Sequence, residues 1–169
     1  HGGDLARRQL IAELMRPAET SEGWSRPSPA ALDHVTRELA WMIVKDGEGV
    51  SKFVEVHVHG AASLADARRA AEAIANSTLV KCAWYGEDPN WGRILAEVGM
   101  TQAVFDPLQI NVALNGVWVC RNGASGDDRE LVDMSGREVI VTIDLNAGPH
   151  EAAIWTNDLT AAYVHENSA

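Results

Sequence analysis

The chain has 169 residues and a formal net charge of −10 at pH 7, with a sequence pI of about 4.9. This length is typical of one domain and is enough to bury a hydrophobic core. The acidic balance argues against nucleic acid and anionic membranes as partners, because both bind surfaces rich in Lys and Arg. No apolar run approaches the ~20 residues that span a bilayer, and no segment resembles a signal peptide. A cytoplasmic protein is therefore expected.

The first 29 residues differ from the rest of the chain. Residues 4–16 have the apolar spacing of a helix, which Pro17 would end. Residues 18–29 are polar and contain one glycine and two prolines, a composition typical of a loop or linker. We therefore expect two regions: an N-terminal helix and linker over 1–29, and the main region over 30–169.

The next elements follow from caps and hydrophobic periodicity. Ser28 and Pro29 predict the start of a second helix that ends near Lys45. Its predicted apolar face consists of Leu32, Val35, Leu39, Met42 and Ile43. Residues 53–59 alternate like a strand with a buried valine face. His57 and His59 share its other face, but no third metal ligand has a suitable position, so no metal site is expected.

A capping box predicts a third helix, because Ser63 is followed three residues later by Asp66. Asn115-Gly116 is the turn signal of a hairpin between short strands at 110–114 and 117–120. Further strands are predicted at 139–145 and 152–155, and a short helix or strand at 159–164. The predicted fold class is α+β, with helices packed on a largely antiparallel sheet.

The densest group of polar residues lies in Lys81–Val98, which reads KCAWYGEDPNWGRILAEV. Its apolar start, residues 80–85, is interpreted as a strand that turns at Gly86 into a helix. Asp88 is the predicted cap of that helix, and Pro89 its first residue. A helix start requires fewer polar side chains than this turn contains, so the group indicates a functional site or the support of one. The group consists of Glu87, Asp88, Asn90 and Arg93 around Trp91.

Four segments of the chain carry a recognisable pattern in a fixed order. Residues 46–52 read DGEGVSK, 76–81 read NSTLVK, 86–93 read GEDPNWGR and 155–160 read WTNDLT. Together they resemble the ornithine acetyltransferase family, the bifunctional glutamate N-acetyltransferases of arginine biosynthesis. The resemblance runs from about residue 30 to the end of the chain. Four ordered motifs are far more specific than a single glycine pattern.

The family's chemistry depends on segments that are not recognised in this sequence. Members are made as one precursor that cuts itself before an internal threonine, and this threonine becomes the acyl-accepting nucleophile at the start of a second chain. The resemblance therefore implies the C-terminal part of that second, beta chain, within a larger two-chain acetyltransferase fold. The implied partners are the missing alpha chain and the N-terminal part of the beta chain, which together form a hetero-oligomer.

Two residues are predicted to bind substrate. Glu48 lies between two glycines, so its carboxylate could be presented on a sharp turn to an ammonium group, although a solvated turn residue has the same pattern. In the family, the glutamate of this motif contacts the amino-acid substrate. Asn167 is an ordinary tail residue by itself, but the resemblance implies that it too is a substrate ligand. The residues expected to support the site rather than to react are Asp88, Asn90, Trp91 and Arg93 of the GEDPNWGR segment.

The implied activity is acyl transfer from N-acetylornithine to glutamate through a threonine acetyl-enzyme. This chain would orient the amino acid and supply no catalytic residue, so it is predicted to be inactive alone. No bound cofactor or metal is expected, while acetyl-CoA serves bifunctional members as an acyl donor. The alternative is a non-catalytic amino-acid-binding or oligomerisation module derived from the same family.

Overall fold

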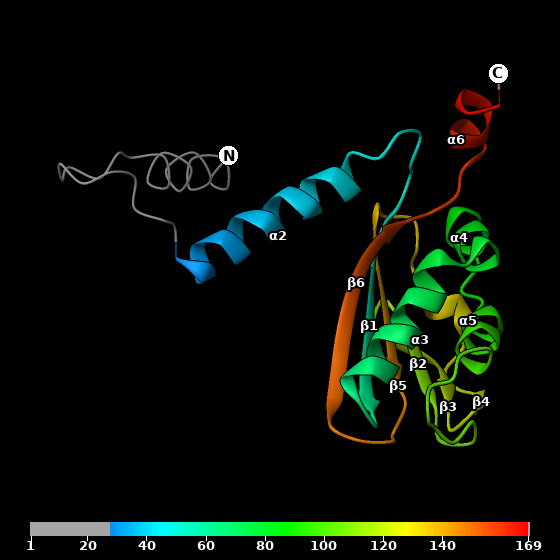
Figure 1. Cartoon of the computed structure of the whole chain (residues 1–169). Helices are drawn as coiled ribbons and strands as arrows, with labels where there is room; N and C mark the ends of the chain where they lie inside the picture. Colours follow the sequence, from blue (N-terminus) through cyan, green and yellow to red (C-terminus); the bar gives the residue numbers. More distant parts are fainter. Residues whose placement is uncertain (1–27, 169) are drawn as a thin grey trace. The chain divides into compact units, whose positions relative to one another are not determined.

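The structure is a computed structural model that describes residues 28–168 (Figure 1). These residues fall into two units, 28–42 and 43–168, and each is described by itself. The predicted helix at 4–16 and most of the predicted linker lie outside the described residues. No helix among the described residues is long and apolar enough to cross a membrane.

Helix α2 (Pro29–Lys45) begins and ends where the sequence predicts. Ser28 caps its first turn, because the Ser28 hydroxyl accepts a hydrogen bond from the Ala31 amide at 3.1 Å. The last residues of α2 belong to the second unit, and side chains of that unit bind two of their carbonyls. Asn157 donates to the Val44 carbonyl at 2.6 Å, and the guanidinium of Arg137 donates to the Lys45 carbonyl.

The second unit is built on one six-stranded sheet with the order β4-β3-β2-β5-β1-β6. The strands are β1 (Phe53–Ala61), β2 (Asn111–Leu114), β3 (Val117–Arg121), β4 (Ala124–Ser125), β5 (Glu138–Asp144) and β6 (His150–Asn157). Only β1 and β5 pair in parallel, and the other four pairings are antiparallel. The predicted α+β class with a largely antiparallel sheet is confirmed.

The core lies between this sheet and three helices on one of its faces (Figure 1). The helices are α3 (Leu64–Asn76), α4 (Thr78–Tyr85) and α5 (Trp91–Gly99). Val54, Val56 and Val58 of β1 are completely buried, as the alternation predicts. Alanines on α3 are also completely buried, and their small size lets the helix approach the sheet closely. The predicted cap of α3 is present: the Ser63 hydroxyl accepts from the Asp66 amide at 3.1 Å.

The interpretation of residues 80–85 as a strand is wrong, because they form most of helix α4. Ser77 caps this helix by accepting from the Val80 amide at 3.2 Å. The buried residues Val80, Ala83 and Trp84 follow a helical spacing, so the apolar run forms one face of a helix. A short apolar run does not by itself distinguish a strand from a buried helix, and here the serine cap decides for the helix.

The remaining elements agree with the sequence more closely. Asn115 and Gly116 both have positive φ, as the predicted tight hairpin turn between β2 and β3 requires. The polar loop after β3 contains the short strand β4 and a 3₁₀ turn, η1 (Arg129–Leu131). The last segment is a helix, α6 (Ala161–Glu166), which Thr160 caps by accepting from the Tyr163 amide at 3.0 Å.

Candidate functional site

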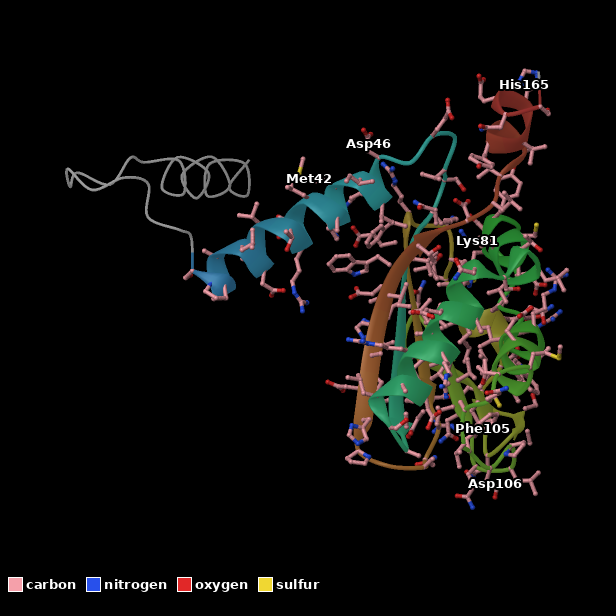
Figure 2. All side chains as sticks on the ribbon, in the orientation of Figure 1. Met42, Asp46, Lys81, Phe105, Asp106 and His165 are labelled. Atoms are coloured by element: carbon pink, nitrogen blue, oxygen red, sulfur yellow. The ribbon has the colours of Figure 1, made fainter. Side chains whose placement is uncertain are left out.

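The four motif segments, which span more than a hundred residues of sequence, come together at one end of the second unit. Figure 2 labels Asp46, Lys81 and His165 at this end, and Phe105 and Asp106 at the opposite end. Hydrogen bonds join the segments directly. We call the set of residues 46–52, 81–93 and 158–167 the motif end.

Asp158 is the central acceptor of the motif end. Its Oδ1 accepts from the backbone amides of Ser51 and Lys52, each at 3.0 Å, and its Oδ2 accepts from the Ser51 hydroxyl. The carboxylate is only 4% exposed. These bonds hold the two residues that directly precede β1 against the segment that follows β6. The WTNDLT motif thereby holds the DGEG turn in position.

The two residues after Asp158 form further hydrogen bonds, one to α4 and one to the DGEG turn. The Leu159 amide donates to the Lys81 carbonyl at 3.4 Å, which links the segment to α4. The Thr160 hydroxyl donates to the Gly49 carbonyl at 2.5 Å, which links it to the turn that carries Glu48. Residues 158–160 therefore lie between the DGEG turn and α4.

The two glycines beside Glu48 have different roles. Gly49 has a φ of +65°, and a Cβ there would lie 2.7 Å from the backbone nitrogen of Tyr163 in α6. Gly47 has no positive φ, and its nearest contact would be a flexible Val50 side-chain atom at 3.1 Å. Gly49 is therefore required by the close approach of the chain's last helix, whereas Gly47 is not.

Gly49→Ala is expected to lower the free energy of unfolding by about 2 kcal/mol, because it adds backbone strain and displaces α6. Urea denaturation monitored by circular dichroism measures this loss. Gly47→Ala in the same turn serves as the control and should cost less than about 1 kcal/mol. Equal losses in the two variants would contradict the role given to Gly49.

Lys52 is the buried cation of the motif end, with 5% of its surface exposed. Its Nζ donates to Glu87 Oε1 at 2.6 Å, to the Met134 carbonyl at 2.6 Å and to the Gly136 carbonyl at 3.0 Å. Glu87 has a φ of +53°, a conformation that is uncommon outside glycine. Lys52 thus connects the DGEG segment to the turn that carries Glu87 and to residues 134–136, which precede β5.

The predicted cap of α5 is wrong by two residues. Asn90, rather than Asp88, caps the helix by accepting from the Arg93 amide at 3.2 Å. The reason is that the turn is bonded to the end of α4, since the Asp88 amide donates to the Ala83 carbonyl at 2.9 Å. Asp88 instead accepts from the Asn90 side-chain amide at 2.9 Å and steadies the cap.

The GEDPNWGR segment also contains Trp91 and Arg93, and both make contacts that support the fold. Trp91 is partly buried and packs against the core. The Arg93 guanidinium donates to the Leu79 carbonyl at 2.8 Å, which ties the start of α5 to α4. These contacts are compatible with the supporting role of Asp88, Asn90, Trp91 and Arg93, which stays a prediction.

The two predicted substrate ligands lie on neighbouring parts of the motif end. Glu48 is exposed on its turn, directly before Gly49. Asn167 follows α6 and is also exposed; its side-chain amide donates to the Tyr163 carbonyl at 2.9 Å. Since the Tyr163 backbone is packed against Gly49, the turn and the last helix are adjacent. No hydrogen bond joins the two side chains in the described part of the chain.

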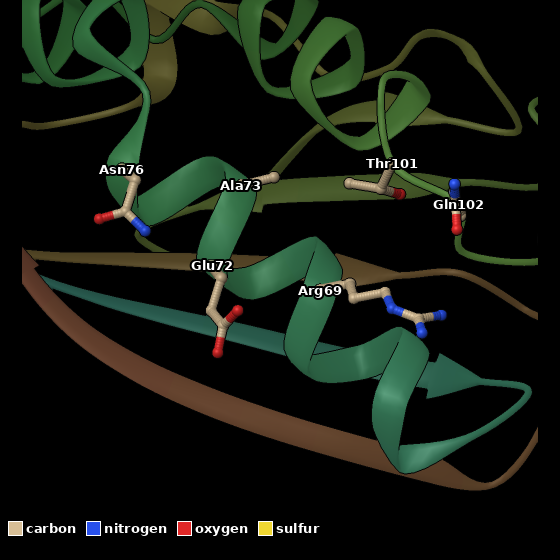
Figure 3. A pocket seen from close by; sticks show the side chains of 6 residues that line it. All are labelled: Arg69, Glu72, Ala73, Asn76, Thr101 and Gln102. Carbon is tan, nitrogen blue, oxygen red and sulfur yellow. The ribbon is translucent and has the colours of Figure 1, made fainter.

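The hollows among the described residues include a groove and a more open depression. A groove of about 440 Å³ lies beside the motif end between α4 and α6, and it is lined by Cys82, Tyr85, Leu159, Thr160, Ala161, Val164 and His165. The depression, of about 390 Å³, is lined mostly by polar residues, which Figure 3 shows: Arg69, Glu72, Ala73, Asn76, Thr101 and Gln102. No group of three or more potential metal ligands is found within residues 28–168.

Comparison with known proteins identifies the family. The ArgJ family model matches residues 12–169. The chain belongs to the ArgJ family. This confirms the resemblance that the four motifs indicate, and the match to the ArgJ family begins earlier in the chain than the motifs do.

Relatives in the ArgJ family are similar to this chain over most of its length. It is 56% identical over 138 residues to "Arginine biosynthesis bifunctional protein ArgJ 1" of Streptomyces clavuligerus, a match that covers 82% of this chain and 36% of the relative. It is 44% identical over 155 residues to the ArgJ protein of Mycobacterium tuberculosis H37Rv, with coverages of 88% and 38%. The chain thus spans little more than a third of the length of these curated relatives.

A solved ArgJ structure has the same fold. The crystal structure of the arginine biosynthesis bifunctional protein ArgJ from Bacillus halodurans matches this chain with a TM-score of 0.77 and 26% identity. The match covers 99% of this chain and 93% of the Bacillus halodurans chain.

Proposed function

We propose that this chain is the amino-acid-orienting part of an acyltransferase that moves an acetyl group from N-acetylornithine to glutamate. The observation that carries the proposal is the motif end, where four family motifs meet around buried, fully bonded polar groups. Such preorganisation holds ligand-binding side chains in place before substrate arrives. The names of the relatives, bifunctional proteins of arginine biosynthesis, support this activity.

The reaction requires groups that lie on other segments. An acetyl group is accepted by the hydroxyl of an N-terminal threonine, whose own amine acts as the base, and is then transferred to glutamate. Donors that bind the tetrahedral oxyanion lower the barrier of both steps. In this proposal Glu48 and Asn167 orient the amino acid, no bound cofactor is required, and acetyl-CoA is an additional acyl donor.

The proposed partners are the alpha chain and the N-terminal part of the beta chain. The coverages support a divided polypeptide: this chain covers 93% of the Bacillus halodurans chain but only 36% of the Streptomyces clavuligerus relative. The solved chain is therefore much shorter than that relative, as expected if the precursor is cut into two chains. The missing segments would then assemble with this one.

A chimeric enzyme tests the proposal. The matched 138 residues of the Streptomyces clavuligerus relative are replaced by the corresponding residues of this chain, which 56% identity makes feasible. We expect the chimera to transfer acetyl from N-acetylornithine to glutamate and this chain alone to transfer none. Mass spectrometry should find the acetyl group on the N-terminal threonine of the second chain, in the part that comes from the Streptomyces clavuligerus enzyme. A folded chimera without transfer, beside an active parent enzyme, would favour the non-catalytic binding or oligomerisation module.

Glu48→Gln in the chimera is expected to lower kcat/KM for N-acetylornithine by about 10- to 150-fold, because one charge-assisted contact to the substrate's ammonium group is lost. Steady-state kinetics at several donor concentrations measures this change. Glu130→Gln, the same substitution on an exposed residue of η1, is the control and should leave kcat/KM unchanged. If Glu48→Gln behaves like this control, Glu48 is not a substrate ligand.

A further inference from the structure

Thr160 lies between the two segments that carry the predicted substrate ligands. It is buried, with 3% of its surface exposed. Its hydroxyl donates to the Gly49 carbonyl at 2.5 Å and accepts from the Tyr163 amide at 3.0 Å. A hydroxyl has one proton to donate and lone pairs to accept with, so it can form both bonds at once. One oxygen atom therefore joins the turn that carries Glu48 to the first turn of α6.

On the side of the turn, the Thr160 hydroxyl holds the backbone that presents Glu48. Gly49 follows Glu48 directly, so a bond to the Gly49 carbonyl restrains the peptide unit next to the predicted ligand. Within the turn itself, the Val50 amide donates to the Gly47 carbonyl at 3.4 Å, which is long for a hydrogen bond and therefore weak. The position of Glu48 thus depends more on Thr160 than on the turn's own hydrogen bond.

On the side of the helix, the same hydroxyl holds the element that leads to Asn167. Tyr163 donates its amide to Thr160, and its carbonyl accepts from both the backbone amide of Asn167 at 3.2 Å and the side-chain amide of Asn167 at 2.9 Å. Helix α6 has only six residues, too few to be stable without contacts to the rest of the chain. A change in its capping bond would therefore be passed on to Asn167.

We propose that Thr160 is a positioning residue, whose hydroxyl sets the position of Glu48 relative to Asn167 and so orients the amino-acid substrate. This inference rests on the proposed function, in which both residues bind substrate. Thr160 does not itself contact the substrate, because it is buried and its proton is already donated to Gly49. Fixing two ligands to one oxygen atom removes their relative freedom before substrate arrives, which lowers the entropic cost of the reaction.

The experiment removes this hydroxyl in the chimeric enzyme. Thr160→Val keeps the shape of the side chain but forms neither hydrogen bond. We expect kcat/KM for N-acetylornithine to fall by roughly 10- to 100-fold, because a displacement of about 1 Å in a positioned group has effects of this size. Thr160→Ser keeps the hydroxyl and should recover most of the loss. Thr160→Ala, which also lacks the hydroxyl, takes the place of Thr160→Val if that variant does not fold.

Thr101→Val is the matched control. The hydroxyl of Thr101 also forms one bond of each kind, since it donates to the Val98 carbonyl at 2.7 Å and accepts from the Ala103 amide at 3.2 Å. Thr101 follows α5 and lies outside the motif end. This variant loses a comparable pair of bonds, so kcat/KM should change by less than about twofold. All variants are assayed below the temperature at which thermal unfolding begins.

A double-mutant cycle separates positioning from a merely structural role. If Thr160 acts through Glu48, the loss caused by Thr160→Val should be at least threefold smaller in the Glu48→Gln chimera than in the unmodified one. An equal loss in both, a loss no larger than that of Thr101→Val, or no recovery in Thr160→Ser would overturn the assignment of Thr160. A chimera that transfers no acetyl group overturns the proposed function and this inference with it. An active chimera that responds to Glu48→Gln but not to Thr160→Val removes only Thr160.

Discussion

Replacing Lys52 by methionine is expected to lower the free energy of unfolding by about 3 kcal/mol. Methionine keeps most of the side-chain volume but donates no hydrogen bond. The substitution therefore leaves the Met134 and Gly136 carbonyls without their donor and removes the partner of the Glu87 carboxylate. The Glu87 side chain is half exposed, so water can hydrate its carboxylate and offset part of the loss of Lys52. The turn at Glu87, with its positive φ, should also become less ordered.

Urea denaturation of the chain carrying Lys52→Met measures the effect, and Lys45→Met is the matched control. Lys45 forms an ion pair with Glu138 at 2.9 Å, but its side chain is 30% exposed and its partner is 67% exposed. Exposed pairs contribute about 1 kcal/mol or less. A loss at Lys52 no larger than that at Lys45 would show that the buried network contributes little to stability.

The second large effect is expected from Asp158→Ala, which should cost about 2–4 kcal/mol. This carboxylate accepts three hydrogen bonds, and the Lys52 amide that it binds lies in a buried part of the chain. Its loss also releases the segment that carries Thr160 from the turn that carries Glu48. The same denaturation experiment measures the change.

Asp158→Asn separates geometry from charge. Its carbonyl oxygen can occupy the Oδ1 position and accept from both backbone amides, while its amide faces the Ser51 hydroxyl. We therefore expect Asp158→Asn to cost less than half as much as Asp158→Ala. An equal cost would mean that the negative charge, rather than the hydrogen-bond geometry, holds the motif end together.

Much of the fold could be predicted from the sequence because its signals are local. Ser28, Ser63 and Asn115-Gly116 define helix starts and a hairpin turn through contacts within a few residues of themselves. The alternating valines of β1 likewise predict which face of the strand is buried. Local cap chemistry was ambiguous where two suitable residues, Asp88 and Asn90, lie two positions apart, and the contact of the turn with α4 decides between them.

The network at the motif end could not be predicted, because its partners are distant in sequence. Lys52 and Glu87 are 35 residues apart, and Lys52 and Asp158 are 106 residues apart. In the sequence, Lys52 is an ordinary lysine of a motif. Only the three-dimensional arrangement shows that all three N–H donors of its ammonium group are used. The likeness to the ArgJ family identified the segments that matter, but not the bonds that join them.

The long separation between the DGEG turn and residues 158–160 also has a consequence for folding. Contacts between distant residues form slowly, because a long loop must close before they are gained. During synthesis, helices such as α3 can form locally, whereas β1 can pair only after β5 and β6, the strands on either side of it, have emerged from the ribosome. Asp158 and Thr160 are synthesised late, so the DGEG turn lacks their hydrogen bonds until then. The motif end would therefore be among the last parts of this chain to reach its final structure.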